Sequence, residues 1–200
     1  GSPSSGARAT AAGHSSSERK TVPQSDKASP AEIHQTLSLL LAQLTLRPAH
    51  REHLRSPKRG LSDEQIEALG FKSTPPPFLC RSITDRLIRQ GCRVQGVPGF
   101  YRDDSGHWTM AFYKKTSGIG FDGRLQGFQI MLDVPLKHKD DPPEKPGAKY
   151  IWFSSSSKTD GTGSGSPVHL IGDPSARVVY VIEGLLKADI SHCLTGRTFA

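Results

Sequence analysis

Residues 178–190, VVYVIEGLLKADI, decide the predicted fold of this chain. Five β-forming residues without a charge predict a strand that is buried on both faces, as in a parallel sheet. Glu183 and Gly184 end that strand, and an amphipathic helix follows until Gly196 stops it, after which residues 198–200 begin another strand. An acid at the carboxyl end of a parallel strand lies where open α/β sheets bind ligands. The apolar residues at near-helical spacing are Leu185, Leu186, Ile190 and Leu194.

This strand, turn and helix resemble the opening of a Toprim domain, the metal-dependent catalytic module of primases and topoisomerases. The resemblance implies that Glu183 is an acid/base and metal-associated residue, and that a later Asp-x-Asp pair completes a Mg²⁺ site. No such pair follows before Ala200, and the acid pairs at 103–104 and 140–141 lie upstream with a different spacing. We therefore expect Mg²⁺ only with acids downstream of this chain, in a longer protein. The alternative for Glu183 is a helix-capping acid, and Lys187 either faces phosphate or is a solvated helix lysine.

The composition predicts a chain that is rich in loops. Only 34% of the 200 residues are hydrophobic, and 20 Gly and 15 Pro interrupt regular structure. Residues 1–28 hold almost no large apolar side chains, so we expect a disordered tail there. The sequence contains no signal peptide and no apolar span, which predicts a cytoplasmic protein without membrane contact. The cysteines Cys80, Cys92 and Cys193 lack metal-ligand spacing and are expected to be free thiols.

Residues 29–92 are predicted to form a small helical region. Capping boxes at Ser29 and Ser62 mark two helix starts, Pro48 begins a third helix, and three prolines at 75–77 precede a fourth. The formal net charge of +7 favours an anionic partner such as nucleic acid. The basic residues of this region either contact phosphates or form a solvated face. The residues considered for phosphate contact are Arg47, Arg51, Arg55, Lys58 and Arg59.

Residues 93–176 are predicted to form a curled antiparallel β-rich segment. Turns at 103–106 and 122–123 separate short strands, and the second turn leads into a strand with apolar residues at alternate positions. Trp108 and Trp152 lie on predicted strands of this segment. They either stack on the bases of single-stranded DNA or pack in the core, because aromatic residues on strands serve both purposes.

Five segments in a fixed order widen the resemblance. Together they are similar to an uncharacterised primase-related family of plasmids, phages and integrative elements, often found beside a helicase. This implies that the β-rich segment helps to hold a template, and that a replicative helicase is a candidate partner. Residues 118–121 depart from the family's pattern of an apolar strand that ends in proline-arginine-aspartate. The five segments are LSDEQI at 61–66, GVPGFY at 96–101, GFQIMLD at 127–133, KYIWFSS at 149–155 and EGLLKAD at 183–189.

These features predict an α+β fold in three parts: the helical region at 29–92, the β-rich segment at 93–176, and the first strand and helix of a Toprim-like sheet at 177–200. The first hypothesis is the N-terminal portion of a mobile-element DNA primase-like protein, which binds DNA, chiefly single-stranded. Its full-length form would transfer phosphoryl groups with Mg²⁺, and this chain alone would be inactive. The second hypothesis is a non-enzymatic module that binds DNA or a helicase.

Overall fold

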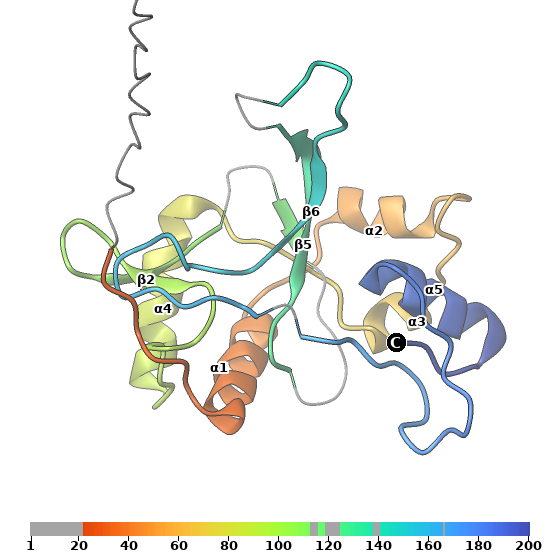
Figure 1. Cartoon of the computed structure of the whole chain (residues 1–200), viewed down its shortest axis with the longest axis horizontal. Coiled ribbons are helices and arrows are strands. Elements are labelled where there is room, and N and C mark those ends of the chain that lie inside the picture. Colours follow the sequence, from red (N-terminus) through yellow and green to blue (C-terminus); the bar gives the residue numbers. More distant parts are fainter. Residues whose placement is uncertain (1–21, 113–115, 119–124, 138–140, 166) are drawn as a thin grey trace, which may run out of the picture.

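A long antiparallel hairpin, β5 (Gln129–Leu136) and β6 (Ala148–Trp152), runs through the middle of the molecule (Figure 1). The computed structural model describes residues 22–112, 116–118, 125–137, 141–165 and 167–200. Helices and antiparallel strands are mixed along the chain, which confirms the predicted α+β class. The other elements are α1 (Pro30–Ala42), α2 (Pro48–Arg55), α3 (Asp63–Ala68), β1 (Lys72–Ser73), α4 (Pro77–Arg89), β2 (Phe100–Arg102), β3 (Trp108–Met110), β4 (Thr116–Gly118) and α5 (Leu185–Thr195).

The strands form two antiparallel sheets. One sheet has the order β1-β4-β5-β6, and β2 and β3 form a separate hairpin. Ile130 lies opposite Ile151 in the larger sheet, and a register shift follows within β5. Beyond this shift the hairpin extends away from the body of the molecule (Figure 1). We call this extension, residues 133–137 and 141–149, the hairpin arm.

β5 lies between two hydrophobic cores because both of its faces are apolar. Ile130 and Leu132 pack with side chains from α1 and α4, in what we call the first core. Met131 lies between them in the sequence, so its side chain points to the opposite face of the sheet. There it packs with side chains from α2, α3 and α5, in the second core. Helices therefore lie on both sides of the central hairpin, as Figure 1 shows.

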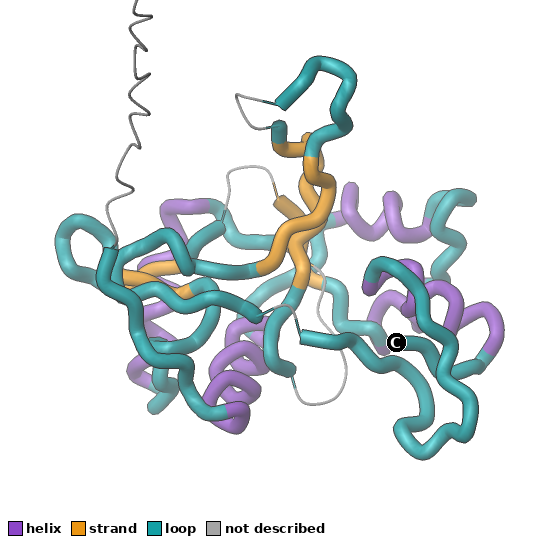
Figure 2. The backbone as a smooth tube through the Cα atoms, in the orientation of Figure 1, coloured by secondary structure: helices purple, strands orange, loops and turns teal. Residues whose placement is uncertain are grey.

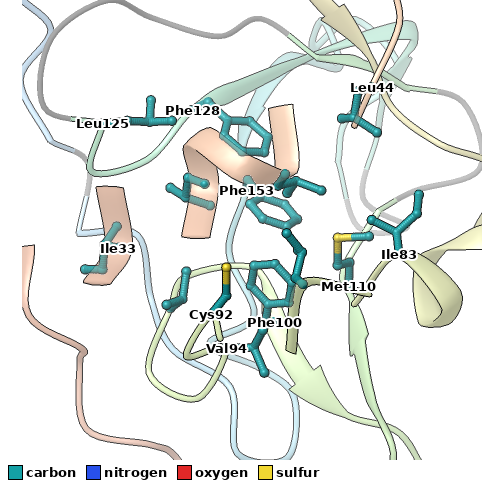
Figure 3. Packing of buried hydrophobic residues seen from close by; sticks show 14 of the residues in the cluster. Ile33, Leu44, Ile83, Cys92, Val94, Phe100, Met110, Leu125, Phe128 and Phe153 are labelled. Carbon is teal, nitrogen blue, oxygen red and sulfur yellow. The ribbon is translucent and has the colours of Figure 1, made fainter. Parts of the chain in front are cut away.

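Phenylalanine rings fill the centre of the first core (Figure 3). The Phe153 ring stacks on Phe128 with their centroids 4.6 Å apart, and Phe100 meets Phe153 edge-on at 5.9 Å. All three side chains are fully buried. Gly99 lies directly against the Phe153 ring with a φ of +90°, so a side chain at position 99 would collide with the ring. The packing of this core therefore requires a glycine there.

Local capping sets the helix boundaries, as the sequence predicts. The Ser29 hydroxyl accepts a bond from the Glu32 N–H, and the Glu32 carboxylate accepts one from the Ser29 N–H. Ser62 and Gln65 repeat this arrangement at the start of α3. Prolines occupy the first turns of α1, α2 and α4. Gly196, with a φ of +66°, ends α5.

The N-terminal boundary of the fold differs from the prediction. Residues 22–28 were assigned to the tail, but the Ser25 N–H donates to the Gly161 carbonyl at 3.1 Å, and Ala28 is buried in the first core. Backbone pairing with a neighbouring loop needs no large apolar side chain, which is why composition does not detect it. Residues 1–21 of the predicted tail lie outside the described residues.

The stretch 178–182 is not the doubly covered strand that its sequence predicts. It makes one β-bridge, at Tyr180, and this bridge is parallel to Phe199. Phe199 packs with α5 in a third, small core. α5 lies against one face of this pairing, whereas Val179 and Val181 are exposed. The prediction assumed a second covering layer, and the described part of the chain supplies none.

Irregular structure occupies the chain between β6 and α5 (Figure 2). Within the described part of residues 153–184, regular pairing is limited to isolated bridges. The predicted hairpin at 122–123 lies outside the described residues. Throughout the described ranges, each helix is too short or too polar to cross a membrane.

Candidate functional site

Three cations from two separate segments of the chain gather around His53, near the end of α2. The pKa of His53 is lowered, first by partial burial and then by the charges of Arg59, Lys149 and Lys58. Lys58 and Arg59 follow α2, whereas Lys149 lies on β6. We call Lys58, Arg59 and Lys149 the basic surface. The fold thus concentrates positive charge that the sequence places in two separate segments.

Hydrogen bonds hold the basic surface against the central hairpin. Arg59 Nη2 donates to the Tyr150 hydroxyl at 3.1 Å, and Tyr150 packs against the second core. The Nε of Arg59 is buried and has no hydrogen-bond partner among the described residues. His50 on α2 places Nε2 3.5 Å from Asp133 Oδ1 on β5. α2 and the loop after it are therefore attached to both strands of the hairpin.

Lys58 and Lys149 project their charges into solvent. Both residues are exposed, and within the described ranges neither forms an ion pair with an acidic side chain. Lys145 on the hairpin arm differs, because its Nζ lies 2.6 Å from Asp141 Oδ1. An exposed cation without an internal partner attracts external anions most strongly. Lys149 was not among the predicted site residues, although it begins the KYIWFSS segment at 149–155.

The arginines of α2 are engaged within the protein. Arg51 Nη1 donates to Asp63 Oδ1 at 2.8 Å, and Arg55 Nη1 lies 3.5 Å from Asp63 Oδ2. Arg51 also lies 3.5 Å from Glu67. The bond from Arg51 lowers the pKa of Asp63. These pairs join α2 to α3, so the charges of Arg51 and Arg55 are partly neutralised within the protein.

The two predicted tryptophans lie on different sheets. Trp108 on β3 is partly buried against the first core, and the Arg102 guanidinium lies 4.7 Å from the centre of its ring. Trp152 is at the end of β6 and is also partly buried. The guanidinium already covers one face of the Trp108 ring, which leaves less of it for a base. Stacking of either tryptophan on DNA stays a prediction.

Glu183 lies at the turn between the stretch 178–182 and α5, as the sequence predicts. The Ile182 N–H donates to the Ala200 carbonyl at 3.0 Å, so the backbone before Glu183 runs parallel to the backbone after α5. Glu183 and Lys187 are both exposed. Among the described residues, no group of three or more His, Cys, Asp or Glu side chains is placed to hold a metal ion. The Mg²⁺ role of Glu183 stays a prediction.

A buried contact between His169 and Asp189 on α5 was not predicted from the sequence. His169 Nε2 lies 2.7 Å from Asp189 Oδ1, and Asp189 Oδ2 has no hydrogen-bond partner among the described residues. Burial raises the pKa of Asp189, and the bond from His169 opposes that rise. The available signal was spacing, because Asp189 follows Leu186 by one turn and precedes Ile190 on the apolar face. Leu194, predicted on the same face, is exposed instead.

Comparisons of the chain with known protein families, with curated proteins and with solved structures give no match. The resemblance to the primase-related family therefore stays a prediction.

Proposed function

We propose that this chain binds DNA through the basic surface. The observation that supports the proposal most is the convergence of Lys58, Arg59 and Lys149 around His53, whose pKa is lowered first by partial burial and then by these three charges. Lysine and arginine side chains that neutralise phosphates release bound counterions, and this release drives association. Lys58 and Lys149 are suited to this role because they are exposed and, within the described ranges, have no acidic partner.

The hairpin arm enlarges the surface that a DNA strand would meet. The arm begins at Lys149 on β6 and also carries Lys137, whereas its Lys145 is paired with Asp141. A positively charged groove or ridge that follows a phosphate backbone is the usual basis of binding without sequence preference. The primase-related resemblance favours single-stranded DNA, the form in which a template is copied.

The test is a fluorescence-anisotropy titration of labelled single-stranded and duplex DNA over a series of salt concentrations. Lys58→Ala and Lys149→Ala should each weaken binding and reduce the slope of log K against log salt by about 1. Lys158→Ala is the matched control, because Lys158 lies over the Tyr101 ring of β2, away from the basic surface.

The titration has four informative outcomes. Binding that weakens in both variants and not in the control supports the basic surface. Equal losses in all three variants would mean that DNA responds only to net charge, which overturns the proposal. No binding of wild type at low salt also overturns the proposal and favours a protein partner such as a helicase. A preference for duplex over single-stranded DNA would correct the proposed ligand.

A second candidate function, Mg²⁺-dependent phosphoryl transfer by a longer form of the protein, rests on Glu183. The observation that favours it is the parallel pairing of the extended stretches before and after α5, with Glu183 at the turn before the helix. Oxygen ligands such as carboxylates are those that Mg²⁺ prefers, and one carboxylate does not complete such a site. If Glu183 acts with Mg²⁺, the ion should change the DNA affinity of wild type and not that of Glu183→Gln. Equal responses to Mg²⁺ would leave the chain as a non-enzymatic binding module.

A further inference from the structure

The stretch 178–182 has one paired edge and one unpaired edge. The Tyr180 N–H donates to the Thr198 carbonyl, and the Tyr180 carbonyl accepts from the Ala200 N–H, each at 2.9 Å. Successive residues of an extended strand direct their backbone groups to opposite sides. The N–H and C=O groups of Val179 and Val181 therefore face away from residues 198–200. Within the described ranges they form no backbone hydrogen bond.

The side chains along this edge are apolar and exposed. Val178 is 62% exposed, Val179 42% and Val181 88%. The five residues from 178 to 182 are all β-formers without a charge, and none is a proline. Sheet proteins normally protect such an edge with lysine, proline or a covering segment, because it pairs readily with another strand. This edge has none of these protections within the described part of the chain.

The charges at the ends of the stretch indicate which strand would pair with it. Arg177 lies three residues before Tyr180 and Glu183 lies three residues after it, and both are exposed. If two copies of the stretch pair antiparallel about Tyr180, each Arg177 lies opposite Glu183 of the partner subunit. Parallel pairing in register would instead place like charges side by side, which is unfavourable. The sequence is thus complementary in charge to its own antiparallel copy.

The backbone geometry fits the same register. Pairing about Tyr180 places Val179 opposite Val181 of the partner subunit, and these are the residues whose N–H and C=O groups face the free edge. Directly opposite residues project to the same face of a sheet, so the exposed valines of both copies would form one apolar cluster. The twofold axis would lie at Tyr180, as a self-complementary interface requires.

We propose that this chain self-associates by antiparallel pairing of the edge 178–182 with the same edge of a second copy. Strand addition to an exposed edge is a common mode of recognition, in which the backbone supplies affinity and side chains supply specificity. A short strand pair buries less than the roughly 1,200 Å² of a stable interface, so we expect a weak dimer that depends on protein concentration. The inference is independent of DNA binding.

Analytical ultracentrifugation over a wide range of protein concentration tests the proposal. Arg177→Glu and Glu183→Arg should each weaken self-association by about tenfold, because each variant places like charges opposite one another at both ends of the pair. An equimolar mixture of the two variants should recover wild-type association, since every opposing pair then has opposite charges. The doubly exchanged variant should recover it as well. Recovery in the mixture cannot arise from a folding defect.

Exposed valines provide the matched control for apolar contact. Val181→Lys on the edge should reduce association, whereas Val168→Lys should not, although Val168 and Val181 are similarly exposed at 85% and 88%. A wild-type protein that stays monomeric at the highest concentration overturns the proposal. Open-ended aggregation in place of a dimer, or equal effects of the two lysine variants, also overturns it.

Discussion

Asp189 on α5 is paired with His169 on the preceding loop, and both side chains are nearly inaccessible, at 1% and 8% exposure. The pair attaches residues 167–171 to the helix that follows Glu183, next to the third core. His192 and Cys193 are the other titratable groups that interact with the Asp189 carboxyl. Since one carboxylate oxygen has no partner among the described residues, the charged form of Asp189 is costly in this setting.

Asp189 should make the free energy of unfolding depend on pH. Burial raises the pKa of this carboxyl above the 3.8 of an exposed aspartate, so the folded protein holds the proton more tightly than the unfolded chain. Its contribution to stability is therefore largest at low pH and is lost as pH rises from 3.8 through the raised pKa. Asp189→Asn should remove this loss of stability with rising pH. Measuring Tm as a function of pH for both proteins tests this.

Asp173→Asn is the control for that experiment, because its pKa is shifted in the opposite direction. Bonds from Ser175 lower the pKa of Asp173, so this carboxylate stabilises the fold above pH 3.8 and loses its contribution as pH falls. The two asparagine variants should change the pH profile with opposite signs. Identical changes would show that the Asp189 side chain is not buried as described.

The pKa of His53 should report DNA binding at the basic surface. Positive charges on Arg59, Lys149 and Lys58 lower it in the free protein, after the effect of burial. Phosphates that neutralise these charges should raise it, and so should the Lys58→Ala/Lys149→Ala double variant without DNA. Proton NMR titration of the imidazole measures both effects. A pKa of His53 that DNA leaves unchanged would place the DNA elsewhere.

Gly99→Ala should destabilise the first core by roughly 2–5 kcal/mol, combining the cost of a positive φ with overpacking. An added Cβ would meet the buried Phe153 ring. Gly106→Ala is the matched control, since Gly106 also has a positive φ but would meet no atom within 4 Å. This control should cost only about 1–2 kcal/mol. Urea denaturation compares the two variants, and equal losses would contradict the contact between Gly99 and Phe153.

The three free thiols should differ in their rates of alkylation. Burial raises the pKa of Cys80 to about 11, and Cys80 and Cys92 are both inaccessible, whereas Cys193 is partly exposed. Cys193 should therefore react first in the native protein. Its pKa is raised by burial and by the charge of Asp189, so Asp189→Asn should speed its alkylation. Mass spectrometry of partly labelled protein identifies the reactive cysteine, and earlier labelling of Cys80 would contradict the burial described above.

Short-range signals predicted the helices well. Ser29 with Glu32, and Ser62 with Gln65, act within one turn of the chain, so their effect does not depend on the rest of the fold. For the uncharged stretch 178–182, the predicted burial of both faces was wrong. β-forming residues indicate an extended backbone but not the number of layers that cover it. Met131 is the opposite case. The alternating pattern of its strand places it on the polar face, whereas the structure buries it in the second core.

The candidate site was harder to predict than the helices. Lys149 becomes a neighbour of His53 only because β6 lies beside α2, and such a contact between distant segments leaves no local pattern. The acidic partner of Arg51 and Arg55 was also not predicted, although Asp63 is the first residue of the next helix, α3. Sequence patterns located the charges, and tertiary packing decides which of them remain available.

The position of β5 between two cores has a consequence for how the chain unfolds. Ile130 and Leu132 on one face, and Met131 on the other, belong to a single strand, so neither core keeps its packing when this strand separates from β6. The helices on the two sides of the hairpin are thus expected to melt as one cooperative unit. Amide hydrogen exchange in α1 and in α3 should then report the same free energy of opening, even though the two helices lie in different cores.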